Sequence, residues 1–351
     1  MSTWGDLYNG RTSYDFVGNW KRWFAGSAIA LIVSVFSLLM LHLDLSIDFT
    51  GGTIITAENA SDATVASYRS ALSDVGQQGA TVQITGANQV IVQTESLPSG
   101  DQDALVEVVA AVAGVSFDDT NVDAVGPTFG AEITRHAVWA LVWFLLVVAG
   151  FIWWRFQWKM SMAALAALGH DLIITAGIYA LIGFEVTPAT VIAILTILGY
   201  SLYDTVVVFD KIEENTAELH GRYTFGEIAN LSLNQVLMRS INTSFTSLLP
   251  IGSLLFVGSY LLGAATLRQF ALALFIGIGI GTYSSIFLAT PLLALWKERE
   301  PEWQRMQRRR LRKSGDEETA VSVSAGVADA HAELRDTGAV PRPPRKRKKR
   351  R

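Results

Sequence analysis

The sequence predicts an α-helical polytopic membrane protein with six transmembrane helices and a small α+β ferredoxin-like extracytoplasmic domain between helices 1 and 2. Three observations lead to this fold class. Half of the 351 residues are hydrophobic and only 17% are charged, which gives a mean hydropathy of +0.31, unusual for a soluble chain. Six apolar runs are long enough to cross a bilayer. A polar segment with the element order of a ferredoxin-like domain separates the first two runs.

Each apolar run reaches or approaches the roughly 18 residues that a spanning helix needs. We expect transmembrane helices at about 24–43, 137–154, 161–184, 187–209, 243–262 and 270–296. The first run follows basic residues, as the core of a signal peptide does. Its apolar core is longer than the roughly 7–15 residues of such a peptide, and no A-x-A site follows it. We therefore expect an uncleaved first span.

Basic residues in short loops predict that both termini are cytoplasmic. On this topology residues 1–23 and 297–351 are cytoplasmic, and residues 44–134 are extracytoplasmic. Most basic residues near the spans then lie on the cytoplasmic side: Lys21, Arg22, Arg155, Lys159, Lys211, Arg222 and Arg239. Arg69, Arg135 and Arg268 are the exceptions.

The extracytoplasmic segment reads as alternating strands and helices. We expect strands at 51–59, 79–85, 88–96 and 120–125 and helices at 61–76 and 99–114, the β-α-β-β-α-β order of a ferredoxin-like domain. Ser61 and Ser99 are candidate N-caps, and Gly76 and Gly114 are candidate helix stops. Between Asp44 and Gly126 there are twelve Asp and Glu residues and one basic residue, Arg69, so this segment is acidic.

Several chemistries have no support in the sequence. The chain has no cysteine, which excludes disulfides, thiolate metal sites and thiol catalysis. Its five histidines show no metal-ligand spacing, and there is no Walker-type phosphate loop. We expect no metal, no cofactor and no enzymatic activity.

Asp204 is the strongest candidate for a functional residue, because it lies within the apolar run 187–209. A carboxylate in a spanning helix costs about 2.5–3.5 kcal/mol on insertion scales and usually faces the bundle interior. Arg239, at the start of the fifth span, is the natural counter-charge, and a direct or a water-mediated contact remains open. A protonatable Asp that holds or releases an Arg suits ion-coupled motion. The expected proton path comprises Asp204, Arg239, Tyr200, Asn242, Thr243 and Thr246.

His170 and Asp171, near the middle of the third run, are a second candidate for proton exchange, although a structural pair is an equal alternative. Thr282 and Ser285 supply hydroxyls that can line a water path or bond to their own helix. Gly277 and Gly281 allow close helix approach, which more often serves packing than mechanism.

Two cytoplasmic segments have open alternatives. The stretch TFGEIANLSLNQVL, between the fourth and fifth spans, predicts either an interfacial amphipathic helix or one docked on the bundle. From Lys297 to Arg351 there are seventeen Lys and Arg against nine Asp and Glu. We expect a basic, disordered tail that acts as a positive-inside anchor, with contact to anionic lipid or ribosomal RNA as alternatives.

Five segments resemble the SecF family of protein-export membrane subunits, which belongs to the resistance–nodulation–division superfamily. They are IDFTGGT (47–53), VGPTFGAEI (125–133), GYSLYDTVVVFDKIEEN (199–215), LNQVLMRSINTSFTS (233–247) and GTYSSIFLATPLL (281–293). The resemblance covers about residues 20–296. It makes Asp48, Gly51, Gly52, Gly126 and Pro127 motif residues. Leu202, Tyr203 and Lys211 depart from the common motif and leave the Asp intact.

The resemblance implies a subunit of the bacterial Sec export machinery that acts with a separate SecD chain. Such a pair uses the proton motive force to complete polypeptide translocation through SecYEG, and the motif Asp and Arg of its proton path fall on Asp204 and Arg239. The implied location is the bacterial plasma (inner) membrane. The implied partners are SecD, SecYEG, the translocating polypeptide and membrane lipids, with YidC and YajC as further candidates and no specific nucleic acid.

Two other functions fit parts of the sequence. One is half of a proton-coupled small-molecule or lipid exporter of the same superfamily, although about 90 extracytoplasmic residues are few for a substrate cleft. The other is a scaffold that stabilises the translocon without transport. Replacing Asp204 by Asn separates these readings, because a scaffold does not need the carboxylate.

Overall fold

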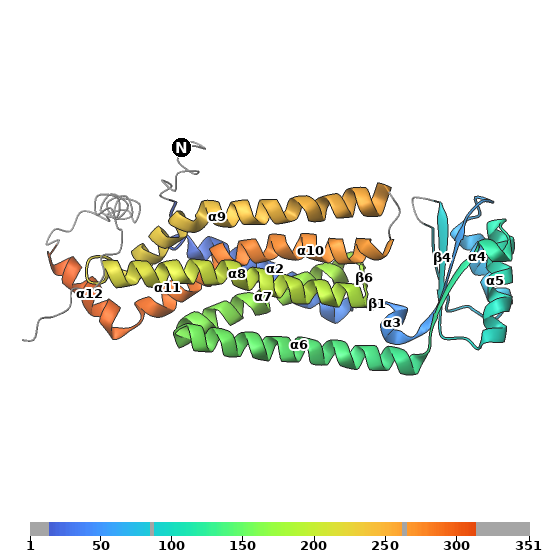
Figure 1. Cartoon of the computed structure of the whole chain (residues 1–351), viewed down its shortest axis with the longest axis horizontal. Coiled ribbons are helices and arrows are strands. Elements are labelled where there is room, and N and C mark those ends of the chain that lie inside the picture. The colour runs from blue at the N-terminus through green and yellow to red at the C-terminus, as the bar shows by residue number, and fades with distance from the viewer. Residues whose placement is uncertain (1–13, 85–87, 262–264, 314–351) are drawn as a thin grey trace, which may run out of the picture. The chain divides into compact units, whose positions relative to one another are not determined.

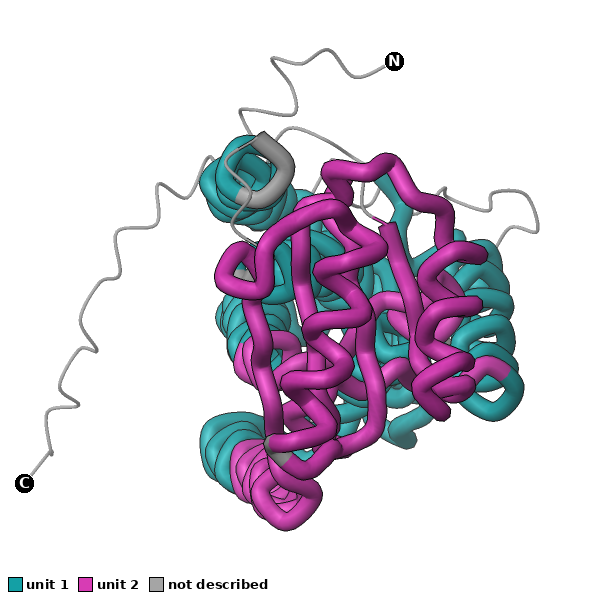
Figure 2. The backbone as a smooth tube through the Cα atoms, turned by 90° about the vertical axis from the view of Figure 1, so that its right-hand side faces the viewer, with its two compact units in different colours: residues 1–40, 147–178, 193–351 teal, residues 41–146, 179–192 magenta. Residues whose placement is uncertain are grey.

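The structure is a computed structural model that describes residues 14–84, 88–261 and 265–313. The chain divides into two compact units, one of residues 1–40, 147–178 and 193–351 and the other of residues 41–146 and 179–192 (Figure 2). The first is a helical unit, and the second holds the four-stranded antiparallel sheet (Figure 1).

Six helices in the described ranges are long and apolar enough to cross a membrane. The first four are α2 (Trp20–Met40), α6 (Pro127–Arg155), α7 (Trp158–Ile182) and α8 (Pro188–Leu219). The fifth consists of α9 (Phe225–Ser253) and the start of a π-helical segment, η2 (Leu254–Leu261). The sixth consists of most of α10 (Ala265–Ser284), a π-helical segment, η3 (Ser285–Ala289), and α11 (Thr290–Glu298). The number of spans that the sequence predicts is confirmed.

The fifth helix starts much earlier than expected, at Phe225 instead of residue 243. Its first turn is fixed by a capping box, in which the side chain of Thr224 accepts from the amide of Glu227 and the Glu227 carboxylate accepts from the amide of Thr224. Ile228 and Leu231 in this first half are fully buried. The amphipathic stretch is therefore the buried first half of α9 and not a separate helix on the membrane surface.

The N-terminal strap, residues 14–17, lies along this first half of α9. The Oδ1 atom of Asn230 accepts from the amide of Phe16 at 2.7 Å, and the Oδ1 atom of Asn234 accepts from the amide of Tyr14 at 3.0 Å. Both asparagines also donate from Nδ2 to the carbonyl of Tyr14. The side chains of Asn230 and Asn234, both fully buried, thus form hydrogen bonds with the backbone of the strap, as the backbone of a neighbouring strand would.

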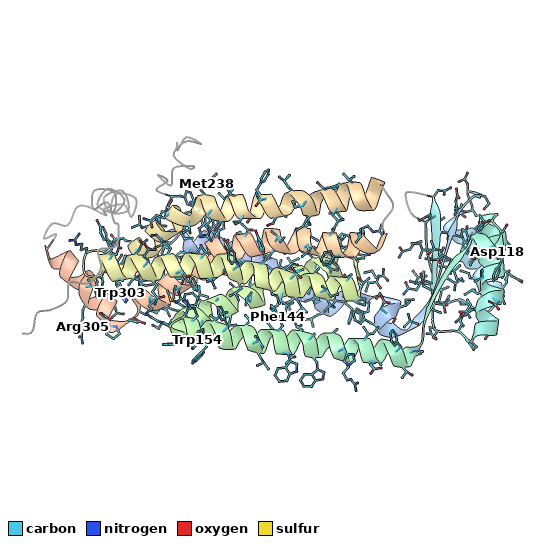
Figure 3. All side chains as sticks on the ribbon, in the orientation of Figure 1. Asp118, Phe144, Trp154, Met238, Trp303 and Arg305 are labelled. Carbon is cyan, nitrogen blue, oxygen red and sulfur yellow. The ribbon has the colours of Figure 1, made fainter. Side chains whose placement is uncertain are left out.

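The expected tail is partly helical. Residues Pro301–Lys313 form α12, although the sequence predicts disorder from residue 297. The reason is Trp303, which is buried and makes edge-on ring contacts with His220 and with Phe225 at the start of α9. Figure 3 labels Trp303 and Arg305 on this helix. The rest of the tail, 314–351, lies outside the described residues.

Close contacts between helices of the helical unit occur at small residues. A Cβ atom on Gly277 would overlap the side chain of Ile197, and one on Gly281 would lie 2.8 Å from Cβ of Ser201. Glycine therefore lets α10 lie directly against α8. Gly177 of α7 similarly meets Ser34 of α2. The ribbons of α9 and α10 run side by side (Figure 1).

The second unit contains a four-stranded antiparallel sheet with strand order β3-β4-β2-β5. Its strands are β2 (Gly52–Glu58), β3 (Thr81–Ile84), β4 (Gln89–Thr94) and β5 (Asn121–Val125). Helices α4 (Val65–Asp74) and α5 (Ser99–Ala113) pack on one face of the sheet (Figures 1 and 2). Strands and helices follow each other in the order that the sequence predicts.

The core of this sheet unit lies between the two helices and the sheet. Ile55, Val90 and Val92 from the strands and Leu72 and Val109 from the helices are at most 1% exposed. Tyr68 of α4 is fully buried as well and donates to Oδ1 of Asn59 at 2.8 Å. Burial raises the pKa of the Tyr68 hydroxyl, so that this group stays neutral in the core.

Two of the expected helix caps are wrong. The N-cap of α4 is Thr64, whose side chain accepts from the amide of Ser67, while Ser61 donates to the carbonyl of Val112. The residue before α5 is Pro98, so Ser99 is already the first residue of the helix. The expected stop at Gly114 is confirmed, because this residue ends α5 in the left-handed conformation with φ of 74°.

The described part of the sheet unit also contains four shorter elements, two strands and two helical turns. Strand β1 (Asp44–Leu45) pairs in parallel with β6 (Glu185–Val186), which joins the segment after α2 to the segment after α7. A single helical turn, α3 (Ile47–Thr50), follows β1, and a 3₁₀ turn, η1 (Phe117–Asp119), precedes β5.

Candidate functional site

Asp204 lies on α8 inside the helical unit and is only 6% exposed. Its Oδ1 atom accepts a hydrogen bond of 2.7 Å from the hydroxyl of Ser240 on α9. Its Oδ2 atom is buried and has no hydrogen-bond partner among the described residues. The carboxylate therefore has one fixed contact, to the neighbouring helix, and one oxygen that is free to take a proton.

Arg239 precedes Ser240 and contacts Tyr203, the residue before Asp204. Its guanidinium donates to the hydroxyl of Tyr203 at 2.8 Å and lies 5.9 Å from the centre of the Tyr203 ring. Both residues are exposed, whereas Asp204 is buried. In the described part of the chain, Arg239 thus pairs with the tyrosine next to Asp204 and not with the carboxylate itself.

The other expected members of the proton path separate into two groups. Tyr200 faces α9, because its hydroxyl accepts from Ser247 at 3.1 Å. Thr243 and Thr246 instead donate to carbonyls of their own helix, and Asn242 is exposed. These three residues lie on the Arg239 side of α9 and do not contact Asp204.

Ser240 and Ser244 are the residues of this site that the sequence reasoning missed. Ser244 bonds to Thr282 of α10 at 2.7 Å, so the expected residue Thr282 takes part in a contact between α9 and α10. Serines at 240 and 244 are four residues apart and share one helix face. That spacing is visible in the sequence and was the signal that could have identified them.

A second buried carboxylate, Asp171 of α7, joins three helices of the helical unit. Its Oδ2 atom accepts from Ser201 of α8 at 2.6 Å and from Ser284 of α10 at 2.8 Å. Its Oδ1 atom lies 3.1 Å from Nδ1 of His170. Asp171 and His170 are 1% and 3% exposed. Three contacts thus hold this carboxylate, compared with one for Asp204.

The expected hydroxyl of Ser285 belongs to the same region. It lies in η3 and forms a 2.9 Å hydrogen bond with Thr205, the residue after Asp204. π-Helical turns occur often at functional sites. Here the turn follows Ser284 directly, so consecutive hydroxyls contact Asp171 and Thr205 on two different helices.

The motif residues of the sheet unit meet at one junction. Gly51 has a φ of 76°, which favours glycine, and a Cβ there would lie 2.8 Å from Cα of Pro127. A Cβ on Gly130 would lie 2.8 Å from the carbonyl oxygen of Phe49. The strands meet at the same place, because Gly52 pairs with Val125. The two separate sequence motifs thus form one joint between β2 and the start of α6.

Two further motif residues have smaller roles at this junction. Asp48 accepts from the hydroxyl of Ser46 at 3.1 Å within α3. Gly126 has open space where a Cβ would be, so close packing does not require glycine there. The described residues contain no group of three or more His, Asp or Glu side chains that could hold a metal ion.

Six apolar helices, two buried carboxylates within them and a small α+β unit define a multi-pass membrane protein with polar chemistry inside its helical part. Residues 105–299 match the family described as protein export membrane protein SecD/SecF, C-terminal. The chain belongs to the SecF family of protein translocase subunits, which are components of the Sec export pathway.

Named relatives agree with this assignment. The SecF subunit of Streptomyces coelicolor is 41% identical over 328 residues, which are 93% of this chain and 88% of that protein. The SecF subunit of Mycobacterium tuberculosis is 41% identical over 92% of this chain and 75% of its own length. The crystal structure of SecDF from Thermus thermophilus, described as a translocon-associated membrane protein, matches with a TM-score of 0.74 and 35% identity. That match covers 82% of this chain and 39% of the SecDF chain.

Proposed function

We propose that this chain is one half of a proton-driven export motor, in which Asp204 is the protonatable group and a separate SecD chain is the other half. The observation that carries the proposal is the hydrogen bond between Asp204 on α8 and Ser240 on α9. It couples the charge of one buried carboxylate to the contact between two membrane helices.

The proton would act through this contact. As a carboxylate, Asp204 accepts from Ser240 and attracts the nearby charge of Arg239. When its free Oδ2 atom binds a proton, that attraction is lost and the helices can shift. Each proton that crosses the membrane supplies about 2.3 kcal/mol per 100 mV of potential. That energy is of the same order as the hydrogen bonds to charged groups that must change, about 1.5–3 kcal/mol each.

An exposed polar face of the helical unit supports SecD as the partner. Arg239, Asn242, Tyr203 and Thr246 are exposed although their helices are apolar enough to span a membrane. Polar and charged groups in contact with lipid are costly, so another protein must cover this face. The relative from Thermus thermophilus is a single SecDF chain, and this chain matches 39% of it. The unmatched part of that chain is long enough to contain a SecD half.

The α+β segment of residues 44–134 would work outside the membrane. Its strand order and its β-α-β-β-α-β sequence support a ferredoxin-like domain. The Lys and Arg residues in the short loops between the other spans support an extracytoplasmic position for residues 44–134. The protein would then lie in the bacterial inner membrane with both termini on the cytoplasmic side. We assign this domain to contact with polypeptide that emerges from SecYEG, with YidC, YajC and membrane lipids as neighbours.

The test replaces Asp204 by Asn in cells and in membrane vesicles that contain SecD and SecYEG. We expect gradient-dependent export to be lost while membrane insertion and assembly with SecD stay normal. Asp210→Asn is the matched control, because Asp210 is a carboxylate on the same helix that is about 44% exposed and pairs with Arg155. Full gradient-driven export in the Asp204 variant would support a scaffold function instead.

A further inference from the structure

We propose that His170 and Asp171 form a second proton-binding site, in which Nε2 of His170 takes up a proton from the aqueous phase and the Asp171 carboxylate balances its charge. This site is separate from Asp204 and does not depend on the function proposed for that residue.

The contacts of Asp171 match an ionised carboxylate beside a histidine that carries its hydrogen on Nδ1. Its Oδ2 atom accepts from two hydroxyls, of Ser201 and Ser284, which is the arrangement that an ionised carboxylate prefers. Its Oδ1 atom lies 3.1 Å from Nδ1 of His170, so this nitrogen carries the hydrogen and donates it. The lone pair of the neutral imidazole is then on Nε2.

Nε2 of His170 is the unexplained atom of the cluster. This atom has no hydrogen-bond partner among the described residues. It is also shielded from water, because His170 is only 3% exposed. A buried polar atom without a partner calls for an explanation, and a catalytic role, a bound water and a bound ion are among those known. A histidine that donates from one nitrogen to a carboxylate and leaves the other nitrogen free is arranged to accept a proton there.

Charge balance favours this step. Without the proton, the pair places one net negative charge inside the helical unit. With a new N–H bond at Nε2, the imidazolium and the carboxylate form a neutral ion pair, and no bond other than that of the proton donor is broken. A neutral pair is cheaper to bury than an isolated carboxylate.

The groups that face the pair come from two neighbouring helices. From α8, Ser201 contacts Asp171, and Asp204 follows three residues later with its own contact to Ser240. From α10, Ser284 contacts Asp171, and the ring of Tyr283 stacks on His170 with centroids 6.3 Å apart. The Tyr283 hydroxyl is held by the carbonyl of Trp23 and by Ser27 of α2. The charged Arg239 of α9 contacts Tyr203 instead.

A spectroscopic titration tests the site. The other four histidines, His42, His136, His220 and His331, are replaced by Gln in the full-length chain, which is labelled with ¹⁵N-histidine and placed in lipid nanodiscs. The sample is titrated with acid over the interval in which the chain stays folded. We expect the single remaining histidine to carry hydrogen on Nδ1 alone at the start of this interval and on both nitrogens at its end. In Asp171→Asn, the second hydrogen should no longer appear in this interval.

The matched control is a single-histidine chain that keeps His42, an exposed residue outside the long helices. Its titration should not respond to Asp171→Asn. The proposal is overturned if His170 stays singly protonated over the whole interval, because the pair is then a structural contact only. This result in the chain with Asp171 intact decides the question even if Asp171→Asn does not fold. The readout needs neither export nor SecD, so it is independent of the result for Asp204→Asn.

Discussion

Asp171 and Asp204 are both buried carboxylates, but they differ in the number of donors that hold them. Asp171 has three contacts, to Ser201, Ser284 and His170. Asp204 has one, to Ser240, and a free buried oxygen. A carboxylate with three contacts keeps its position more firmly than one with a single contact. Asp204 is therefore the carboxylate that changes partners more readily.

The contact of Ser240 gives a prediction about a single hydroxyl. We expect Ser240→Ala to reduce gradient-driven export, because the only hydrogen bond from α9 to the Asp204 carboxylate among the described residues is lost. A hydrogen bond to a charged group contributes about 1.5–3 kcal/mol, which corresponds to a change of about ten-fold or more in the proton-binding equilibrium. The measurement is export into membrane vesicles at a series of pH values.

Ser253→Ala is the control for this variant, since Ser253 is an exposed serine at the end of the same helix. It should leave export unchanged. Equal activity and an equal pH profile for the two variants would show that the Ser240 contact does not matter.

The two carboxylates were predictable from the sequence, and most of their partners were not. A charge inside an apolar run is visible because burying it is costly. Which hydroxyl of RSINTSFTS meets Asp204 depends on the rotation of α9 about its own axis. Neighbouring residues differ by about 100° around a helix, so Ser240 faces inward while Arg239 and Asn242 face outward. That rotation is set by packing against α8 and α10.

At the scale of elements, α9 combines two segments that the sequence presents as different. Its first half is amphipathic and polar enough to read as a surface helix, and its second half is apolar. The capping box at Thr224 and the buried asparagines Asn230 and Asn234 make the first half part of the bundle. Hydropathy finds where a helix enters lipid, whereas hydrogen bonds and packing determine where the helix begins.

The contact between α8 and α10 gives a prediction about helix packing. We expect Gly281→Val to destabilise the protein by about 1–3 kcal/mol, because even a Cβ at this position would lie 2.8 Å from Cβ of Ser201. The shift of Ser201 should also disturb its contact with Asp171. Thermal unfolding of the purified chain in detergent measures the loss.

Gly279→Val is the matched control, two residues away on the same helix, where a Cβ would meet nothing within 4 Å. It should leave the unfolding temperature close to that of the original chain. If both valine variants unfold at the same temperature, close approach at Gly281 is not important for stability.

At the scale of the whole molecule, the polar face of α8 and α9 is a surface that no described part of the chain covers. It consists of Tyr203, Arg239, Asn242 and Thr246, all exposed. The large apolar side chains elsewhere, such as Trp154 of α6 at 82% exposed, need no protein partner if they face lipid (Figure 3). We therefore expect a second membrane protein to cover this face.

Crosslinking tests this conclusion directly, because the chain has no native cysteine. We expect a single cysteine at Asn242 to crosslink to co-expressed SecD, while a single cysteine at Trp154 gives no such product. The measurement is the mass of the crosslinked species in membranes. Efficient crosslinking from Trp154 and none from Asn242 would place the partner on a different face.

The N-terminal strap determines the order in which the molecule can be completed during synthesis. The amide of Phe16 pairs with Asn230, 214 residues later in the chain. At about 5–20 residues per second, the ribosome makes this partner roughly 10–40 s after the strap itself. The strap therefore stays unpaired while most of the chain enters the membrane. Its closure onto α9 is a late step of biogenesis, because it requires the fourth span and the start of the fifth helix to have been made.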